Sequence, residues 1–186
     1  TCGEDAVYGT VGASAVHYKA WKDTSPVPMA EVAEALGKEH LSRQETLVAG
    51  MLRPAHLLDL VRHFAVFKTE QGKTIKVMAR YQQFRAVQLA VERLLTGKTR
   101  EQDGEYDRRG GIIWHTQGSG KSLIMVWLAK WIRENVTDAR VLIITDRTEL
   151  DEQIEGVFKG IGEDIYRTKS GGDMVSVLNA PDEWLI

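Results

Sequence analysis

Residues 110–122 read Gly-Gly-Ile-Ile-Trp-His-Thr-Gln-Gly-Ser-Gly-Lys-Ser, and this stretch decides the fold that the sequence predicts. The run from Gly111 to Trp114 is apolar and contains β-branched residues, which predicts a short strand buried on both faces. The residues from Leu123 to Ile132 are apolar on almost every side, which predicts a buried helix. Between these elements, Gly118-Ser-Gly-Lys-Ser122 is expected to form a glycine turn that joins the strand to the helix.

This turn has the composition of a phosphate-binding loop. Glycines leave backbone N–H groups accessible at the positive end of the following helix, where these groups bind phosphate oxygens. In such loops the lysine reaches the terminal phosphates, and the hydroxyl of the next residue holds Mg²⁺. A turn that merely connects strand and helix is the alternative, but Lys-Ser at this offset between two such elements favours nucleotide binding. The predicted nucleotide-binding residues are Thr116, Gln117, Gly118, Ser119, Gly120, Lys121 and Ser122, with Lys121 also catalytic and Ser122 the Mg²⁺ ligand.

The loop departs from the strict pattern in one position, because His115 stands where glycine is usual. With this histidine, Trp114–Ser122 closely resembles motif I of the R (restriction) subunits of type I restriction-modification enzymes. Val141-Leu-Ile-Ile-Thr-Asp-Arg-Thr-Glu-Leu-Asp-Glu-Gln153 resembles motif Ia of the same motors, and Arg80-Tyr-Gln-Gln-Phe-Arg-Ala86 resembles their glutamine motif. The three motifs occur in the family's order between Met51 and Gln153.

The resemblance implies roles for residues outside the loop. The glutamine of the family's motif reads adenine through its amide, and the matching residue is Gln83, with Gln82 as the less favoured neighbour. Motif Ia faces the translocated DNA in the family, so Thr145 and Arg147 are the candidate phosphate contacts. A surface ion pair of Arg147 with Glu149 or Asp151 is the alternative.

Composition is that of an ordinary globular domain, with 43% hydrophobic and 27% charged residues among 186. No apolar run approaches the ~18 residues that a membrane helix needs, so no membrane is expected as a partner. A single cysteine, Cys2, excludes an internal disulfide and a cysteine-cluster zinc site. The net charge of −2 does not indicate nucleic-acid binding, so any DNA contact must come from local placement of charge.

The sequence predicts an α/β fold, namely a partial P-loop (RecA-like) motor domain with a mostly parallel sheet, preceded by a helical linker region. Residues 1–24 are expected to be the end of a nuclease-like domain or an edge hairpin, and residues 25–70 the helical linker. Residues 71–186 are expected to be the N-terminal part of motor domain 1 of a helicase or translocase, in truncated form. The expected helices are 29–36, 46–52, 54–67, 81–95, 123–132 and 174–178, and the expected strands are 6–8, 15–21, 73–78, 111–114, 139–145 and 165–166.

Two further groups of residues could bind a metal or a phosphate. His56 and His63 lie two turns apart on an expected helix, but a zinc site needs three or four ligands, so half-buried histidines are the favoured interpretation. Arg108 and Arg109 end a charged stretch, 98–109, that is expected to be a solvent-exposed loop.

By resemblance the chain is a piece of an R subunit, which as a full-length enzyme hydrolyses ATP with Mg²⁺, translocates duplex DNA and cleaves it remotely. The implied partners are duplex DNA and the modification and specificity subunits, in the cytoplasm of a bacterium or archaeon. The piece alone is expected to be inactive, because the acidic Mg²⁺ ligand is not found in its required context. The alternatives are another P-loop enzyme, such as a superfamily 2 helicase or a small-molecule kinase, and a non-catalytic DNA-binding or assembly module with a degenerate P-loop.

Overall fold

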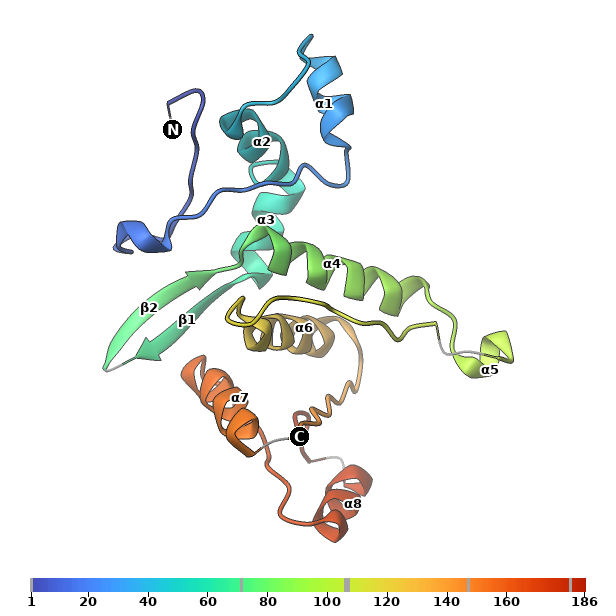
Figure 1. Ribbon diagram of the computed structural model, residues 1–186. Coiled ribbons are helices and arrows are strands. Elements are labelled where there is room, and N and C mark those ends of the chain that lie inside the picture. The colour runs from blue at the N-terminus through green and yellow to red at the C-terminus, as the bar shows by residue number, and fades with distance from the viewer. Residues whose placement is uncertain (1, 71, 106–107, 147, 181) are drawn as a thin grey trace. The chain divides into compact units, whose positions relative to one another are not determined.

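The computed structural model describes residues 2–70, 72–105, 108–146, 148–180 and 182–186. The chain forms two compact units, Thr1–Val66 with Lys76–Ala86 and Phe67–Ile75 with Val87–Ile186. The helices are α1 Met29–Ala35, α2 Arg43–Gly50, α3 Pro54–His63, α4 Tyr81–Thr96, α5 Arg100–Asp103, α6 Lys121–Asn135, α7 Thr148–Gly160 and α8 Gly171–Asn179 (Figure 1). The strands are β1 Ala65–Glu70 and β2 Lys73–Met78, and Ala15–His17 is a 3₁₀ turn.

The core of the first unit is a group of aromatic rings around Trp21 and Phe84. Trp21 is 3% exposed and Phe84 2%, and their ring centroids lie 5.6 Å apart. Phe64 meets Phe84 edge-on at 4.7 Å, and Tyr8 meets Trp21 at 5.7 Å. Buried aromatic pairs in this geometry are worth about 0.5–1.5 kcal/mol each beyond their area, so this group joins the N-terminal segment to the start of α4.

The N-terminal segment is also fixed by a buried hydroxyl. The Tyr8 hydroxyl donates to the Ala79 carbonyl at 2.9 Å, and burial raises the pKa of this phenol, which keeps it a donor. Tyr8 and Lys19 exchange backbone hydrogen bonds of 2.9 Å as an isolated antiparallel bridge. The two strands expected before residue 22 are therefore reduced to this bridge, and a 3₁₀ turn at Ala15–His17 replaces part of the second.

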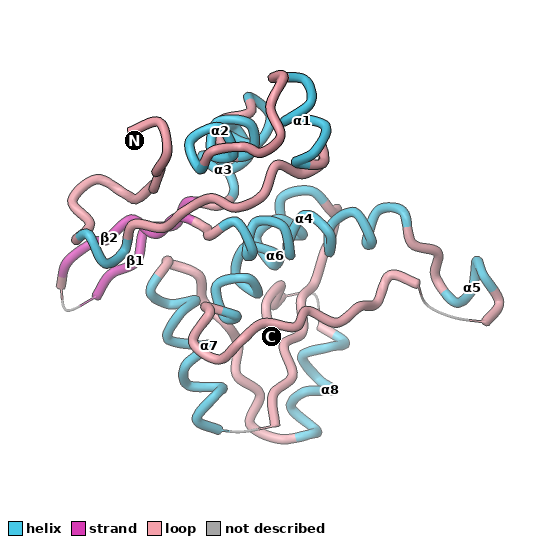
Figure 2. Tube along the Cα trace, turned by 45° about the horizontal axis from the view of Figure 1, so that its top comes forward, coloured by secondary structure: helices cyan, strands magenta, loops and turns pink. Residues whose placement is uncertain are grey.

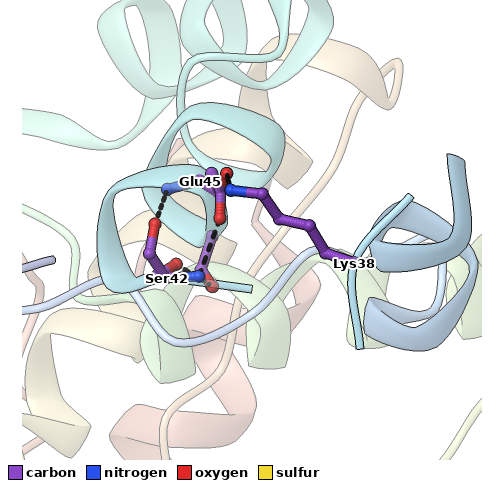
Figure 3. Close-up of polar contacts among 4 residues, drawn as sticks. Lys38, Ser42 and Glu45 are labelled. Atoms are coloured by element: carbon purple, nitrogen blue, oxygen red, sulfur yellow. Dashed lines mark hydrogen bonds and ion pairs between the residues drawn. The ribbon is translucent and has the colours of Figure 1, made fainter. Parts of the chain in front are cut away.

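Helix α2 begins with a reciprocal capping box formed by Ser42 and Glu45. The Ser42 hydroxyl accepts from the Glu45 backbone N–H at 3.2 Å, and the Glu45 carboxylate accepts from the Ser42 N–H at 2.8 Å (Figure 3). Lys38 also donates to Glu45, and this bond together with those of Ser42 lowers the pKa of the carboxyl to about 2. Such a reciprocal cap satisfies two N–H groups that a helix start otherwise leaves without partners.

The region between α3 and α4 differs from the prediction. Helix α3 ends at His63 rather than near Phe67, and β1 follows at once. Strand β2 forms where it was predicted, and the pair makes a two-stranded sheet (Figure 1). The apolar residues 64–67 fit a helix face as well as a strand, and pairing with β2 decides between them, since strand formation depends on cross-strand partners.

The second unit is built on the packing of α6 against α7. Val126, Ala129, Ile154 and Phe158 are 0–2% exposed, and they form one apolar cluster with Leu185. Leu185 belongs to the segment 184–186, which runs parallel to 141–143: the Val141 N–H donates to the Trp184 carbonyl at 2.8 Å, and the Ile186 N–H donates to the Val141 carbonyl at 3.0 Å. The Tyr166 N–H reaches the Leu185 carbonyl from the other side at 3.0 Å. Three segments thus lie side by side under the helices.

The expected mostly parallel sheet is not formed by the described residues. Figure 2 colours β1 and β2 as strands and most of the other predicted strands as loop, and among the described residues the isolated bridge between Val141 and Leu185 is the one that is parallel. The prediction for residues 111–114 is wrong, because Ile112 is 92% and Trp114 91% exposed and no strand is assigned there. The physical reason is that a strand of this kind needs a neighbour on each edge, and none of the described segments pairs with it.

The charged stretch 98–109 also contains structure that the sequence did not indicate. Thr99 caps the short helix α5 through a reciprocal capping box with Gln102. Arg108 forms an ion pair with Asp103 at 2.7 Å, and Arg109 donates to the Gly97 carbonyl at 3.1 Å. Both arginines therefore bind within their own loop.

Gly50 is packed so tightly in the first unit that an added side chain would collide with its neighbours. A Cβ there would lie 1.9 Å from the Asp23 carbonyl oxygen and 2.5 Å from Trp21 Nε1. We predict that Gly50→Ala lowers the free energy of unfolding by about 1–3 kcal/mol, because neighbouring backbone must shift. Gly156→Ala in α7 is the control: nothing lies within 4 Å of its Cβ position, and the helix should gain about 1 kcal/mol. Urea unfolding measures the free energy of unfolding of each variant. Equal midpoints for Gly50→Ala and Gly156→Ala would contradict this packing.

Candidate nucleotide-binding site

The predicted phosphate-binding loop lies at the N-terminus of α6. The helix begins at Lys121, and Gly120 before it has a left-handed φ of 81°. Because the N-cap is glycine, no capping side chain competes for the first N–H groups of the helix. Groups at this end have no carbonyl partner one turn back, and they carry the positive end of the helix dipole. The start of α6 therefore suits an anion.

A tight turn shapes the loop before the helix. The Ser119 N–H donates to the Thr116 carbonyl at 3.3 Å, which closes a four-residue turn, and Gly118 at its third position has φ 74°. A left-handed residue at this position is typical of a type II turn and requires glycine. Nothing lies within 4 Å of where a Cβ of Gly118 would be, so the space over the turn is open. The turn is thus accessible to a ligand on this side.

Lys121 folds back over the same turn. Its ammonium nitrogen lies 3.1 Å from the Thr116 carbonyl oxygen and 3.3 Å from that of His115, and the side chain is solvent-exposed. An ammonium group has three N–H donors, so one remains for a phosphate oxygen while the two carbonyls hold the other two. The loop thus places a cation on the same turn as Gly118. His115 contributes to this contact through its backbone, which explains how a residue other than glycine serves there.

The described loop residues fit a nucleotide phosphate with its Mg²⁺. The donors are backbone N–H groups and an ammonium, which match phosphate oxygens, and the Ser122 hydroxyl is a hard oxygen ligand of the kind that Mg²⁺ takes. The predicted residues divide by exposure. Those that are exposed are Thr116, Gln117, Gly118 and Lys121, and those that are half-buried are Ser119, Gly120 and Ser122.

Gln83 lies in the first unit and is 3% exposed, whereas its neighbour Gln82 is exposed. The Gln83 Oε1 accepts from the Arg80 N–H at 2.8 Å, so the side chain caps the start of α4. An amide oxygen has two lone pairs, so this bond leaves capacity for a second donor. The structure gives Gln83 a folding role at the start of α4, and its reading of adenine stays a prediction.

Thr145, a predicted DNA contact, lines a cavity of about 180 Å³ in the second unit. Its hydroxyl donates to the Asp151 carboxylate, and Arg167 lies 3.5 Å from the same carboxylate and 3.8 Å from that of Glu155. Arg147 lies outside the described residues. Sequence reasoning missed Arg167, because its partners are more than ten residues away and no motif connects them.

The two histidines of α3 have structural partners. His56 is buried, with Nδ1 2.8 Å from the Gly50 carbonyl oxygen and its ring 5.1 Å from that of Phe84. His63 is half-buried, 4.0 Å from Asp59. Among the described residues, no group of three or more His, Cys, Asp or Glu side chains is arranged to hold a metal ion.

Comparison with known proteins defines the class to which this loop belongs. The sequence model of the SWI2/SNF2 ATPase family matches residues 82–186, which is more than half of the chain and includes the whole loop and α6. The chain belongs to this family. Within the part of the chain that is described, no helix is long and apolar enough to cross a membrane.

Individual relatives are endonuclease subunits of type I restriction enzymes. The HindI endonuclease subunit of Haemophilus influenzae is 35% identical over 126 residues, which is 66% of this chain and 12% of that protein. A protein of Methanocaldococcus jannaschii, named provisionally as the MjaIXP endonuclease subunit, is 32% identical over 140 residues, or 72% of this chain and 12% of its own. The SsaAORF53P endonuclease subunit of Staphylococcus saprophyticus is 27% identical over 128 residues, which is 68% of this chain and 12% of that protein. The resemblance that the three motifs predicted is confirmed, and the matched part spans 12% of each relative's length.

Proposed function

We propose that the chain is the ATP-binding part of the restriction subunit of a type I restriction-modification enzyme, which translocates duplex DNA and cleaves it at a distance from its recognition site. The observation that carries the proposal is the loop at the N-terminus of α6, where the Lys121 ammonium folds back onto the turn that contains Gly118. Similarity to type I endonuclease subunits and membership of the SWI2/SNF2 ATPase family support it. The implied location is the cytoplasm of a bacterium or archaeon.

Each loop residue has a role in this proposal. The backbone N–H groups of residues 118–122 bind phosphate oxygens, and Lys121 neutralises charge on the terminal phosphates. Ser122 holds Mg²⁺, which bridges phosphate oxygens and stabilises the charge that develops during hydrolysis. Gln83 recognises adenine. The parallel bridge between Val141 and Leu185 supports a mostly parallel, RecA-like sheet for the motor domain of the whole protein.

The partners proposed are duplex DNA and the modification and specificity subunits. Thr145 and Arg147 contact DNA phosphates, as motif Ia does in the resembling motors. A non-catalytic DNA-binding module and a different P-loop enzyme remain the competing functions.

Removal of the Lys121 ammonium tests the nucleotide site. We expect Lys121→Ala to weaken ATP binding roughly ten- to a hundredfold, because charge-assisted hydrogen bonds to phosphate contribute about 1.5–3 kcal/mol. The whole protein should also lose DNA-stimulated ATP hydrolysis. Lys130→Ala, on the same helix and 3.9 Å from Glu163, is the matched control and should keep both. Hydrolysis that persists in Lys121→Ala would refute the proposed site, and binding without hydrolysis in the unaltered whole protein would favour the non-catalytic module.

The adenine assignment predicts a change in nucleotide preference. Gln83→Ala should reduce the preference of the whole protein for ATP over GTP by about 1–3 kcal/mol, because the base then loses a buried hydrogen-bonding partner. Gln82→Ala is the control and should leave the preference unchanged. The preference is measured as the ratio of kcat/KM for ATP to kcat/KM for GTP. The unfolding midpoint of each variant is recorded as well, because Gln83 also caps α4. Unchanged discrimination by a folded Gln83→Ala variant would assign Gln83 the capping role alone.

A further inference from the structure

Positive charge is concentrated in one stretch of a chain that is acidic overall. Between Arg53 and Arg85 there are seven Lys or Arg residues and two Asp or Glu, a formal charge of +5 in a chain of −2. The remaining residues therefore carry −7. A local excess of this size raises the concentration of anionic partners at the segment that bears it. The middle of this stretch is the β1–β2 ribbon, with Lys68, Lys73 and Lys76.

Near its base, at Val66, the ribbon has a buried and a solvent-exposed face. Successive residues of a strand point to opposite faces, and Val66 is 3% exposed whereas Phe67 is 61% exposed. The Ala79 N–H donates to the Phe64 carbonyl at 3.1 Å, which pairs residue 64 with 79 and sets the register of the two antiparallel strands. In this register Thr74 and Lys76 share the solvent face with Phe67. That face combines an aromatic ring, a hydroxyl and an ammonium.

The lysines of the ribbon differ in their surroundings. Lys68 is half-buried, and its side chain lies against Gly160 at the end of α7, 3.2 Å from the Cβ position of that glycine. Lys73 and Lys76 are solvent-exposed, and within the described ranges no ion pair involves Lys73. Ile75 between them is 40% exposed. The exposed ammonium group of Lys76 shares the face of the Phe67 ring, whereas Lys73 lies next to the turn of the ribbon, on its other face.

We propose that the β1–β2 ribbon is a DNA-contact surface, in which Lys73 and Lys76 bind phosphates of duplex DNA and Phe67 packs against the sugar–phosphate backbone. A two-stranded ribbon is one of the two elements that fit the major groove of B-DNA. The charge complementarity selects the partner, because the ribbon is the basic centre of an acidic chain. The proposal rests on the proposed action on DNA and adds residues that precede the phosphate-binding loop and motif Ia.

Salt dependence of duplex binding tests the ribbon directly. The probe is a duplex of roughly 30 bp without a recognition site, titrated with the full 186-residue chain by fluorescence anisotropy at about 50–200 mM salt. The double variant Lys73→Gln/Lys76→Gln should weaken binding about tenfold at low salt. It should also make the slope of log K against log salt less steep by about two, as for two lost phosphate contacts. The double variant Lys73→Arg/Lys76→Arg should restore the affinity and the slope. Lys22→Gln, which removes an exposed lysine elsewhere, should leave the affinity and the slope unchanged.

The remaining outcomes separate this inference from the proposed function. Phe67→Ala should weaken duplex binding without changing the slope. An unaltered slope in the double glutamine variant, or no duplex binding by the unaltered chain, would overturn the ribbon assignment. Loss of assembly with the modification and specificity subunits at an unchanged slope would also overturn it and make the ribbon a protein interface. ATP binding that depends on Lys121 is measured in the same samples, so the nucleotide site is judged independently.

Discussion

The burial of one face of α6 is the interaction on which the second unit depends. Val126 and Ala129 pack with Ile154 and Phe158 of α7, and Leu185 completes the cluster. Full burial of a side chain such as Phe158 contributes about 1.5–3 kcal/mol, which is more than the ~1 kcal/mol typical of a neutral hydrogen bond such as that between Ser119 and Thr116. Because the side of the helix is fixed, its N-terminus is fixed as well. The turn at Gly118 and the ammonium of Lys121 can then remain exposed without losing their geometry.

The first unit follows the same principle with aromatic side chains. Trp21 and Phe84 are buried against each other, and Gly50 lies so close to Trp21 and the Asp23 carbonyl that no larger residue fits. The N-terminal segment is thereby part of the core that holds the start of α4. Gln83 is placed by this core and by its bond to Arg80. Gln83, which is proposed to recognise adenine, is thus held in place by residues such as Trp21 that precede the part of the chain matched by the ATPase family.

The helices of this protein could be predicted from sequence because their signals are local. The capping box of Ser42 and Glu45 and the apolar periodicity of α4 identify each helix without any distant partner. Strands need partners, and this is where prediction failed: residues 65–70 pair with β2 instead of extending α3, and residues 111–114 pair with none of the described segments. The loop residues were identified because they are consecutive. Arg167 was missed because its contacts with Asp151 and Glu155 arise from the fold.

The central claim is that the N–H groups at the start of α6 bind the phosphates of a nucleotide. Hydrogen exchange of individual backbone amides tests it most directly, with Mg²⁺ and either ATP, inorganic pyrophosphate or adenosine added to the chain. The account predicts that the amides of residues 118–122 exchange more slowly with ATP and with pyrophosphate, and that adenosine leaves them unchanged. Protection confined to other residues, or equal protection by adenosine, would contradict it.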